Sequence, residues 1–257
     1  MTLINGKQTP LIFLHPELLS NWIWKGQKIN LKEYQVITPD IIEHGDNLHN
    51  EEFTIKKASE EIIELIKNET PQGKAILIGI GLGGQIILQI LSMNPELVDK
   101  AIISGVNIKL PTREDTGIWD ETHENYFKLN TKFRIYAILA QYNLKPVKYY
   151  DKIEKSDSSI NPESLYEVIN EVRNFELPII EDSDKLTIFI GEKEERSISQ
   201  SAILIRNQVP SAKIYFVHGT GTLWNILDKK LFNKNIKNII RDKPILDKRI
   251  KLLKKGK

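Results

Sequence analysis

Short apolar runs alternate with amphipathic segments along the chain. The runs are rich in β-branched residues and are bounded by turn-forming residues; they cover residues 10–14, 34–38, 74–80, 100–104, 186–190 and 213–217. Most are continuously apolar, which is typical of strands buried on both faces of a parallel sheet. Between them, apolar residues recur at helical spacing over residues 55–67, 84–92, 201–207 and 231–240. The pattern predicts an α/β fold with a mostly parallel central sheet and helices on both faces.

One long segment interrupts this alternation. Residues 107–184 follow a predicted strand but contain mostly helical patterns and no good strand. Insertions of this kind lie at the carboxyl edge of a parallel sheet, where ligands bind. We therefore expect a core from residues 1–106 and 185–257 and an inserted helical lid over 107–184. The aromatic residues of this segment are expected for the most part to pack the lid's own small core; they are Trp119, Tyr126, Phe127, Phe133, Tyr136, Tyr142, Tyr149, Tyr150, Tyr166 and Phe175.

Composition narrows the classes of protein. A chain of 257 residues suits one large domain with an insertion. Cysteine is absent, which excludes disulfides, thiolate nucleophiles and sulfur-ligated zinc. No apolar run is long enough to span a membrane and the first residues do not resemble a signal peptide, so we expect a cytoplasmic protein.

The charge is unevenly distributed. From Lys229 to the end the net charge is +10, and the first 228 residues carry −8. The tail could touch anionic lipid or nucleic acid, but it contains no aromatic residue after Phe232 and the rest of the chain is acidic. We expect a solvated last helix with a frayed end and no nucleic-acid partner.

A glycine-rich turn follows the third predicted strand. Residues 75–85 read Ala-Ile-Leu-Ile-Gly-Ile-Gly-Leu-Gly-Gly-Gln, with Gly81 at the centre. A strand, a sharp glycine turn and a helix form the context of a nucleophile elbow, G-x-S-x-G. Gly79, Gly81 and Gly84 also fit G-x-G-x-x-G, a phosphate-binding loop. That alternative is weaker, because the turn follows the third strand and no acidic residue closes the next one.

Five motifs in this order resemble those of the α/β-hydrolase family in its small, lidded form. They are Leu-Ile-Phe-Leu-His-Pro-Glu at 11–17 for the strand and oxyanion loop, Asp-Ile-Ile-Glu-His-Gly at 40–45 for the Asp-x-x-Gly-His-Gly loop, Gly-Ile-Gly-Leu-Gly at 79–83 for the elbow, Gly-Glu-Lys-Glu at 191–194 for Gly-x-x-Asp, and Gly-Thr-Gly-Thr at 219–222 for Gly-x-Gly-His. The resemblance runs nearly end to end and implies the α/β-hydrolase fold.

The resemblance also implies which residues stand at the catalytic positions. Gly81 is at the position of the nucleophile, Thr222 at that of the base and Glu194 at that of the acid. A serine hydrolase needs a hydroxyl beside a base and the base beside a carboxylate, and two of these three groups are missing. Conventional ester hydrolysis is therefore not expected.

The resemblance further implies a pocket and oxyanion loop, formed by His15, Pro16, Glu17, Ile80 and Leu82. His15 and His44 fall on family positions that brace loops by hydrogen bonds. Two other histidines, His49 and His123, match no family motif and give no indication of a functional role.

Glu17 and His218 are the candidates for displaced chemistry. A glutamate in the oxyanion loop opposes oxyanion stabilisation but suits general acid–base work or pairing with a donor group on a ligand. The alternatives are that Glu17 faces solvent or pairs with Lys25. His218 ends the last predicted strand four residues before the usual base, so it either reaches the site or simply packs there. Ser104 is expected to be buried core.

Three functional hypotheses follow. The first, which we favour, is a protein that binds a small, largely apolar molecule in a lidded pocket without hydrolysing it. The second is an enzyme with displaced chemistry, such as a lyase, isomerase or cyclase, that uses Glu17 as acid or base. The third is an esterase with a relocated triad. No cofactor is implied, and no metal, because no histidines or carboxylates have ligand spacing.

Overall fold

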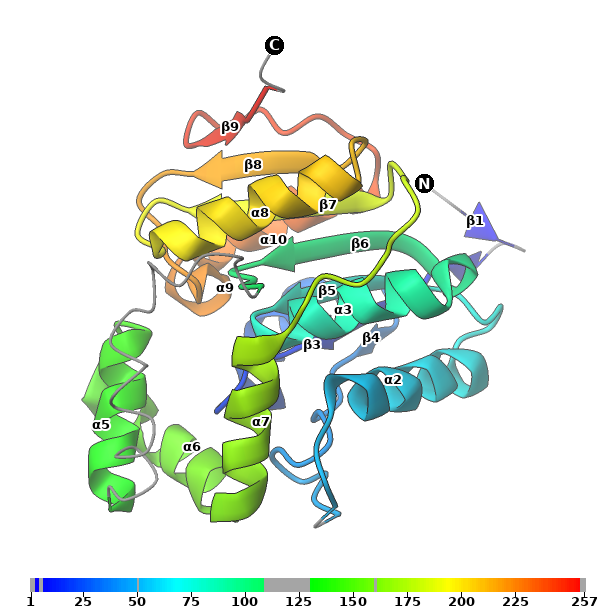
Figure 1. The fold of residues 1–257 in the computed structure, drawn as a ribbon. Coiled ribbons are helices and arrows are strands. Elements are labelled where there is room, and N and C mark those ends of the chain that lie inside the picture. Colours follow the sequence, from blue (N-terminus) through cyan, green and yellow to red (C-terminus); the bar gives the residue numbers. More distant parts are fainter. Residues whose placement is uncertain (1–2, 5–6, 50, 109–129, 160, 255–257) are drawn as a thin grey trace.

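A seven-stranded sheet forms the centre of the protein (Figure 1). The computed structural model describes residues 3–4, 7–49, 51–108, 130–159 and 161–254. The strands are β3 (Leu11–Leu14), β4 (Val36–Ile37), β5 (Ala75–Ile80), β6 (Val98–Ser104), β7 (Leu186–Gly191), β8 (Lys213–Val217) and β9 (Ile250–Leu252). Their order across the sheet is β4-β3-β5-β6-β7-β8-β9, and β3 to β8 all pair in parallel. The six predicted strands are thus confirmed, although β4 is only two residues long.

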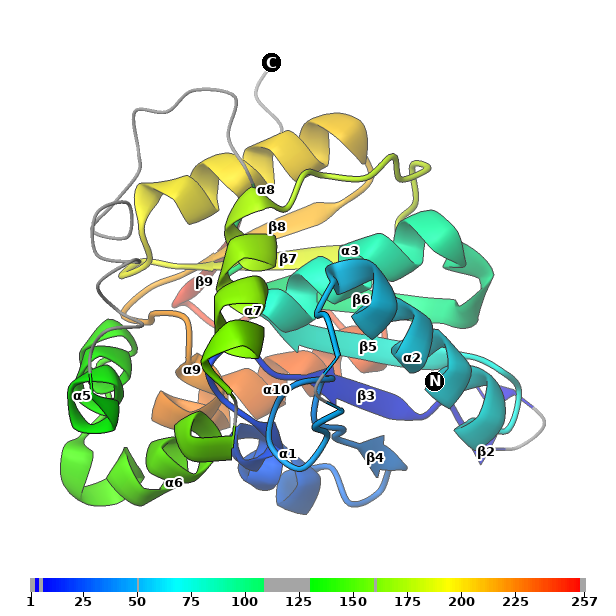
Figure 2. The same ribbon diagram turned by 60° about the horizontal axis from the view of Figure 1, so that its bottom comes forward.

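Helices cover both faces of this sheet, as the alternating pattern predicts (Figure 2). Helices α2, α3 and α8 lie on one face, and α1, α9 and α10 pack against the other. Their bounds are α1 Lys25–Asn30, α2 Ile55–Glu69, α3 Leu82–Met93, α8 Arg196–Gln208, α9 Trp224–Leu227 and α10 Lys229–Ile240, with 3-10 turns at Asn21–Trp24 and Pro95–Leu97.

The strands divide the core into two layers because successive side chains of a strand point to opposite faces. In β3, Ile12 and Leu14 join the cluster under α2 and α3, while Leu11 and Phe13 join the cluster under α1 and α10. All four side chains have no exposed area. Burial on both faces explains why these strands are continuously apolar in sequence.

Three helices of the inserted segment lie on the side of the sheet to which the arrowheads of β6 and β8 point (Figure 1). They are α5 (Thr131–Gln141), α6 (Pro146–Ser159) and α7 (Pro162–Asn174). Helices α6 and α7 are joined to the core by hydrogen bonds between residues far apart in sequence. The Ser156 hydroxyl of α6 bonds to the Ser20 hydroxyl at 3.0 Å, and Glu171 of α7 accepts from the Ile55 N–H that begins α2 at 2.9 Å.

The domain division stays a prediction, because residues 109–129 and 160 lie outside the described residues. Some of the described aromatic side chains in the segment are buried and others are exposed to solvent. Tyr142, Tyr149 and Phe175 are buried, whereas Phe133, Tyr136 and Tyr166 are exposed. The expectation that they pack into a small core therefore does not hold for the three exposed residues. Trp119, Tyr126, Phe127 and also His123 belong to the part that is not described.

The basic tail differs from the prediction. Residues 250–252 form β9, an edge strand that pairs antiparallel with β8, so the expected last helix after α10 is wrong. Only Ile250 of this strand is buried, whereas Lys251 and Leu252 are exposed, so the segment shows neither a strand nor a helix pattern clearly. A lysine on an edge strand, here Lys251, discourages pairing with other chains. At the other end, β1 (Leu3–Ile4) and β2 (Lys7–Gln8) form a small separate antiparallel sheet.

The close packing of β5 against α3 gives the first test. A Cβ on Gly79 would lie 2.4 Å from the Gly83 carbonyl oxygen, which is backbone and cannot move aside. We expect Gly79→Ala to lower the free energy of unfolding by about 2 kcal/mol or more, measured by urea denaturation. The control is Gly26→Ala in α1, where the nearest atom is Cδ of the flexible Lys229 side chain at 3.1 Å. This control should be neutral or slightly stabilising; equal losses in both variants would contradict the packing argument.

Candidate functional site at the Gly81 turn

The turn between β5 and α3 has the geometry of an elbow. Gly81 has φ +55° and ψ −122°, a conformation that residues with side chains rarely adopt. Its N–H donates to the Ser104 carbonyl at the end of β6 (3.1 Å), and its own carbonyl accepts from the Gly84 and Gln85 N–H groups in α3. The turn therefore lies at the carboxyl ends of two central strands.

The first N–H groups of α3 already have partners within the protein. The Leu82 N–H donates to Glu17 Oε2 at 3.2 Å, and the Gly83 N–H donates to the His15 carbonyl at 3.1 Å. A phosphate-binding loop needs such N–H groups free for the ligand. The glycine spacing has a different physical cause, since a Cβ on Gly83 would lie 2.3 Å from the Leu14 carbonyl oxygen.

The Glu17 side chain fills the space beside Gly81. A Cβ on Gly81 would lie 2.7 Å from Glu17 Oε2 and 2.9 Å from the Pro16 Cβ. The other carboxyl oxygen, Oε1, accepts from the Tyr142 hydroxyl of the loop after α5 at 3.2 Å. Glu17 is half-buried, so neither expected alternative, a solvent-facing carboxylate or a pair with Lys25, describes its contacts. A carboxylate at a helix N-terminus is also favoured by the helix dipole.

Glu194 lies beside a second glycine, Gly105, which directly follows the last residue of β6. Gly105 has φ +61°, and a Cβ on it would lie 2.9 Å from Glu194 Oε1 and 2.6 Å from the Thr222 Cγ2. Glu194 Oε2 accepts from the Gly191 N–H at 2.7 Å. Oε1 is fully buried and has no well-aligned hydrogen-bond partner among the described residues.

Burial raises the pKa of the Glu194 carboxyl to about 7, and this effect outweighs the lowering by the Gly191 N–H and the Thr222 hydroxyl. A buried carboxylate loses the hydration that stabilises its charge, so the protonated form is favoured. At neutral pH the group is therefore divided between its two protonation states, which is the range in which an acid–base catalyst works.

His218 follows the last residue of β8, and its described contacts are with other residues. Its Nδ1 is 3.4 Å from Glu192 Oε1, and its ring packs edge-on against Phe216. Its backbone N–H donates to the Arg249 carbonyl. None of its described contacts is with Glu17, Glu194 or Thr222.

His15 and His44 are fully buried and brace loops. The Ile41 N–H donates to His15 Nε2 at 3.0 Å, so the proton of that ring is on Nδ1, which donates to the Pro16 carbonyl at 2.9 Å. Burial lowers the pKa of His15 to about 3 and that of His44 to about 4, so both rings are neutral. His15 thus holds the backbone of the loop that carries Glu17.

Two further candidate residues are strand residues. Ile80 is fully buried in the core cluster under α10. Ser104 is buried core, as expected, and its hydroxyl accepts from the Trp224 indole N–H at 3.1 Å.

The sequence analysis missed two members of the site, Tyr142 and Gly105. Tyr142 was one of many aromatic residues in the inserted segment, and nothing in its spacing marks it as a partner of Glu17. Gly105 carried a usable signal, because it follows a buried strand directly and so stands at the same edge as Gly81.

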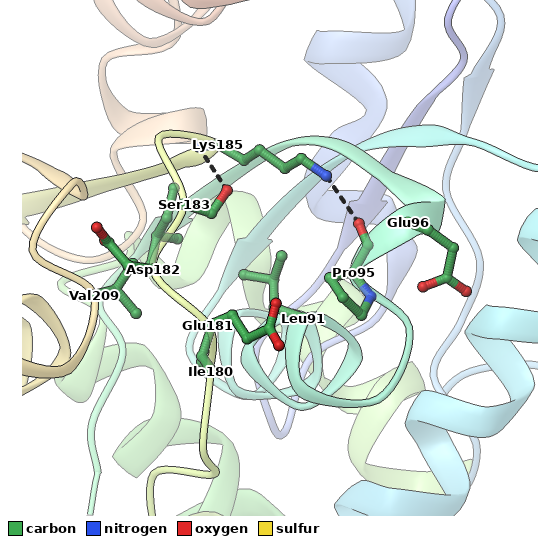
Figure 3. Close-up of a pocket in the computed structure, with 10 residues that line it drawn as sticks. Leu91, Pro95, Glu96, Ile180, Glu181, Asp182, Ser183, Lys185 and Val209 are labelled. Carbon is green, nitrogen blue, oxygen red and sulfur yellow. Dashed lines mark hydrogen bonds between the residues drawn. The ribbon is translucent and has the colours of Figure 1, made fainter.

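A pocket of about 290 Å³ lies away from this site, at the edge where β6 and β7 begin (Figure 3). Leu91, Pro95, Glu181 and Asp182 are among its lining residues, and the Lys185 ammonium donates to the Pro95 carbonyl at 3.0 Å. Ligands of α/β folds bind at the opposite, carboxyl edge of the sheet. Within the described ranges there is no cluster of histidines and carboxylates that could hold a metal ion, and no helix suited to crossing a membrane.

Comparisons with known proteins agree with this topology. Residues 9–134, about half of the chain, match the family model of the alpha/beta hydrolase fold. Over 103 residues the chain is 31% identical to an AB hydrolase superfamily protein of Gibberella zeae; the match covers 39% of this chain and 36% of that protein, so the chain spans about a third of this relative's length. The chain belongs to the α/β-hydrolase family.

Solved structures of similar fold include a hydrolase from Pseudomonas aeruginosa PA01, with a TM-score of 0.73 at 16% identity, covering 91% of this chain and 90% of that chain. A thermophilic esterase from Thermogutta terrifontis has a TM-score of 0.73 at 15% identity, covering 92% of this chain and 90% of that one. At these identities the likeness establishes the fold alone.

The close approach of Glu17 to Gly81 predicts a strong coupling between the two positions. Gly81→Ser should lower the free energy of unfolding by about 1–3 kcal/mol, because the new Cβ meets Glu17 Oε2 and adopts a strained φ. In a Glu17→Ala background the loss should be smaller by about 1 kcal/mol or more, measured as a double-mutant cycle in urea.

The matched control replaces Glu17→Ala with Glu195→Ala, which removes an exposed carboxylate elsewhere. There the two changes should be additive. Additivity in both cycles would mean that Glu17 does not occupy the space beside residue 81.

Glu194 predicts a pH-dependent stability. Its native pKa of about 7 lies above the ordinary value of 4.5, so the native state holds this proton more tightly than the unfolded chain. The resulting stabilisation is complete below pH 4.5 and is lost as the pH rises through 7. Relative to Glu194→Gln, the parent protein should lose roughly 3 kcal/mol of unfolding free energy over this range. Glu195→Gln should track the parent, and a constant difference between parent and Glu194→Gln would refute the assignment.

Proposed function

We propose that this protein binds a small, largely apolar molecule at the Gly81 turn and does not hydrolyse it. The observation that carries the proposal is the hydrogen bond from the Leu82 N–H to the Glu17 carboxylate beside Gly81. By resemblance to the family, this N–H is one of the two that stabilise the oxyanion in a hydrolase.

The missing groups support a loss of ester hydrolysis. Gly81, at the family position of the nucleophile, has no side chain, and Thr222, at that of the base, has a hydroxyl that does not accept a proton at neutral pH. Glu194, at the position of the acid, has no imidazole to orient. Without the nucleophile and the base, the serine mechanism loses most of its rate enhancement.

The Glu17 carboxylate adds an electrostatic argument. In an ester hydrolase, negative charge develops on the carbonyl oxygen and is stabilised by preorganised donors. Here the Leu82 N–H already binds a carboxylate oxygen, so a developing oxyanion would compete with an existing negative charge. The same arrangement would favour a ligand that offers hydrogen-bond donors.

The apolar character of the ligand is proposed from the inner surface of the inserted helices. The buried side chains Ile135, Ile138 and Leu139 of α5 belong to the same apolar cluster as Leu18 and Leu19, which follow Glu17. A ligand beside Tyr142 and Glu17 would therefore meet one carboxyl group in largely apolar surroundings.

A second candidate function is an enzyme with displaced chemistry, in which Glu17 acts as acid or base. The pKa of about 7 at Glu194 favours it, because a pair of carboxyl groups in different environments can divide acid and base roles. An esterase with a relocated triad has less support, since the described contacts of His218 are with Glu192 and Phe216.

The proposal predicts no protein-dependent hydrolysis of p-nitrophenyl butyrate at any pH from about 6 to about 9, where a histidine base would be neutral enough to act. The rate in buffer alone is the reference, and a serine esterase of the same fold is the positive control. A saturable rate above buffer would overturn the proposal. If His218→Ala abolished that rate, the relocated triad would be the better account.

Binding is tested separately by screening small apolar fragments against ¹⁵N-labelled protein. Fragments that bind at the proposed site should shift the Leu82 amide resonance and leave that of Lys185, in the pocket at the other edge, unchanged. Shifts confined to Lys185 and its neighbours would move the binding site to that pocket and contradict the proposal.

A further inference from the structure

The outer edge of the central sheet carries exposed basic and apolar side chains together. Residues 243–254 connect α10 to β9 and include β9, which lies beyond β8 as the last strand of the sheet (Figure 1). We call these residues the basic edge. Within them the sequence has five lysines and arginines and one acidic residue.

Three leucines of the basic edge are exposed to solvent. Leu246, Leu252 and Leu253 have 84%, 53% and 37% of their surface exposed. The last two are held on the sheet, because Leu252 pairs with Tyr215 of β8 and the Leu253 N–H donates to the Ile214 carbonyl at 2.8 Å. Single exposed apolar residues are common in proteins, but a concentration of them marks an interaction surface.

Four lysines stand between and beside these leucines. Lys243, Lys248, Lys251 and Lys254 are exposed. Among the residues that the structure describes, no carboxylate lies within 4 Å of their ammonium groups. Their positive charge is therefore available to a partner outside the protein.

The one acidic residue of the basic edge, Asp247, is occupied within the protein. Its carboxylate accepts from Lys234 Nζ at 3.3 Å and from the Arg249 N–H at 3.1 Å, and its side chain is 19% exposed. The Arg249 guanidinium in turn pairs with Asp228 at 2.7 Å. These pairs leave the four lysines as the uncompensated charges of the edge.

The charge of the whole chain is divided in the same direction. From Lys229 to the end the net charge is +10, whereas the first 228 residues carry −8. A negatively charged surface would repel most of the molecule and attract this one side, so it would orient the protein as well as bind it.

We propose that the basic edge binds the surface of an anionic lipid bilayer, with its lysines at the lipid phosphates and its exposed leucines in the interfacial layer. Attraction of basic residues to anionic lipids and burial of apolar side chains add to each other in this kind of binding. The inference does not depend on the ligand proposed for the Gly81 turn. It would hold the protein beside the phase in which apolar molecules dissolve.

Two other occupants fit the basic edge less well. Proteins bind single-stranded nucleic acid by stacking bases on aromatic side chains, and residues 243–254 contain no aromatic residue. A second copy of the chain that paired through β9 would bring lysines of the same charge together, which opposes edge-to-edge pairing. Neither occupant would bury the leucines beside a compensating negative charge.

The test measures how much of the whole protein sediments with sucrose-loaded vesicles. Vesicles of phosphatidylcholine with roughly 30% phosphatidylserine are compared with vesicles of phosphatidylcholine alone. At about 0.1 M salt we expect a partition coefficient at least about tenfold higher for the anionic vesicles, and at about 0.5 M salt most of that difference should be lost.

Paired variants locate the binding surface. Lys251→Gln with Lys254→Gln should weaken partitioning to anionic vesicles about tenfold or more. The matched control is Lys56→Gln with Lys74→Gln, which removes the same charge from exposed lysines of α2 and of the residue before β5, and should bind as the parent does.

Leu246→Gln tests the apolar contribution. It should weaken partitioning about threefold or more and leave the salt dependence unchanged, because no charge is removed. All the substituted residues are exposed, and urea denaturation of each variant shows whether it is folded.

Three results would overturn the proposal. They are equal partitioning to neutral and anionic vesicles, no effect of the Lys251 and Lys254 changes beyond that of the control pair, and displacement of the protein from vesicles by a single-stranded RNA of about 20 nucleotides. The last would assign the basic edge to nucleic acid. Each of them would leave the small-molecule site at the Gly81 turn standing, whereas hydrolysis of p-nitrophenyl butyrate would remove that function and leave membrane binding untouched.

Discussion

The contact between the Glu17 carboxylate and the first turn of α3 organises the centre of this site. It ties the loop after β3 to the elbow after β5 and, through Tyr142, to the segment after α5. The contact requires glycine at residue 81, because a Cβ there would lie 2.7 Å from the Glu17 Oε2 atom. A nucleophile at residue 81 and a carboxylate in this position therefore exclude each other.

Lack of space for a side chain also explains the other glycines of the elbow. Gly79 and Gly83 allow α3 to approach β5 and β3 within van der Waals contact, and this packing is a property of the fold. The neutral His15 ring braces the loop that carries Glu17, through bonds to the Ile41 N–H and the Pro16 carbonyl. The α/β-hydrolase fold is thus preserved around the Gly81 turn.

Charge also underlies the proposed function. A hydrolase site offers donors to a developing anion, whereas the Gly81 and Gly105 turns present carboxyl oxygens. Burial raises the pKa of Glu194 to about 7, which is the expected response of a buried acid without a cation.

The sequence by itself determined the six parallel strands, the main helices of the core and the glycine elbow, because burial on both faces and helical periodicity leave clear patterns. It was wrong about residues 250–252, since a three-residue edge strand has too little periodicity to be distinguished from a basic helix. It named Glu17 and Glu194 but could not pair Glu17 with Tyr142, 125 residues away. Only the tertiary structure decided those contacts, because hydrogen bonds between distant segments depend on how strands and helices pack and leave no local pattern in the chain.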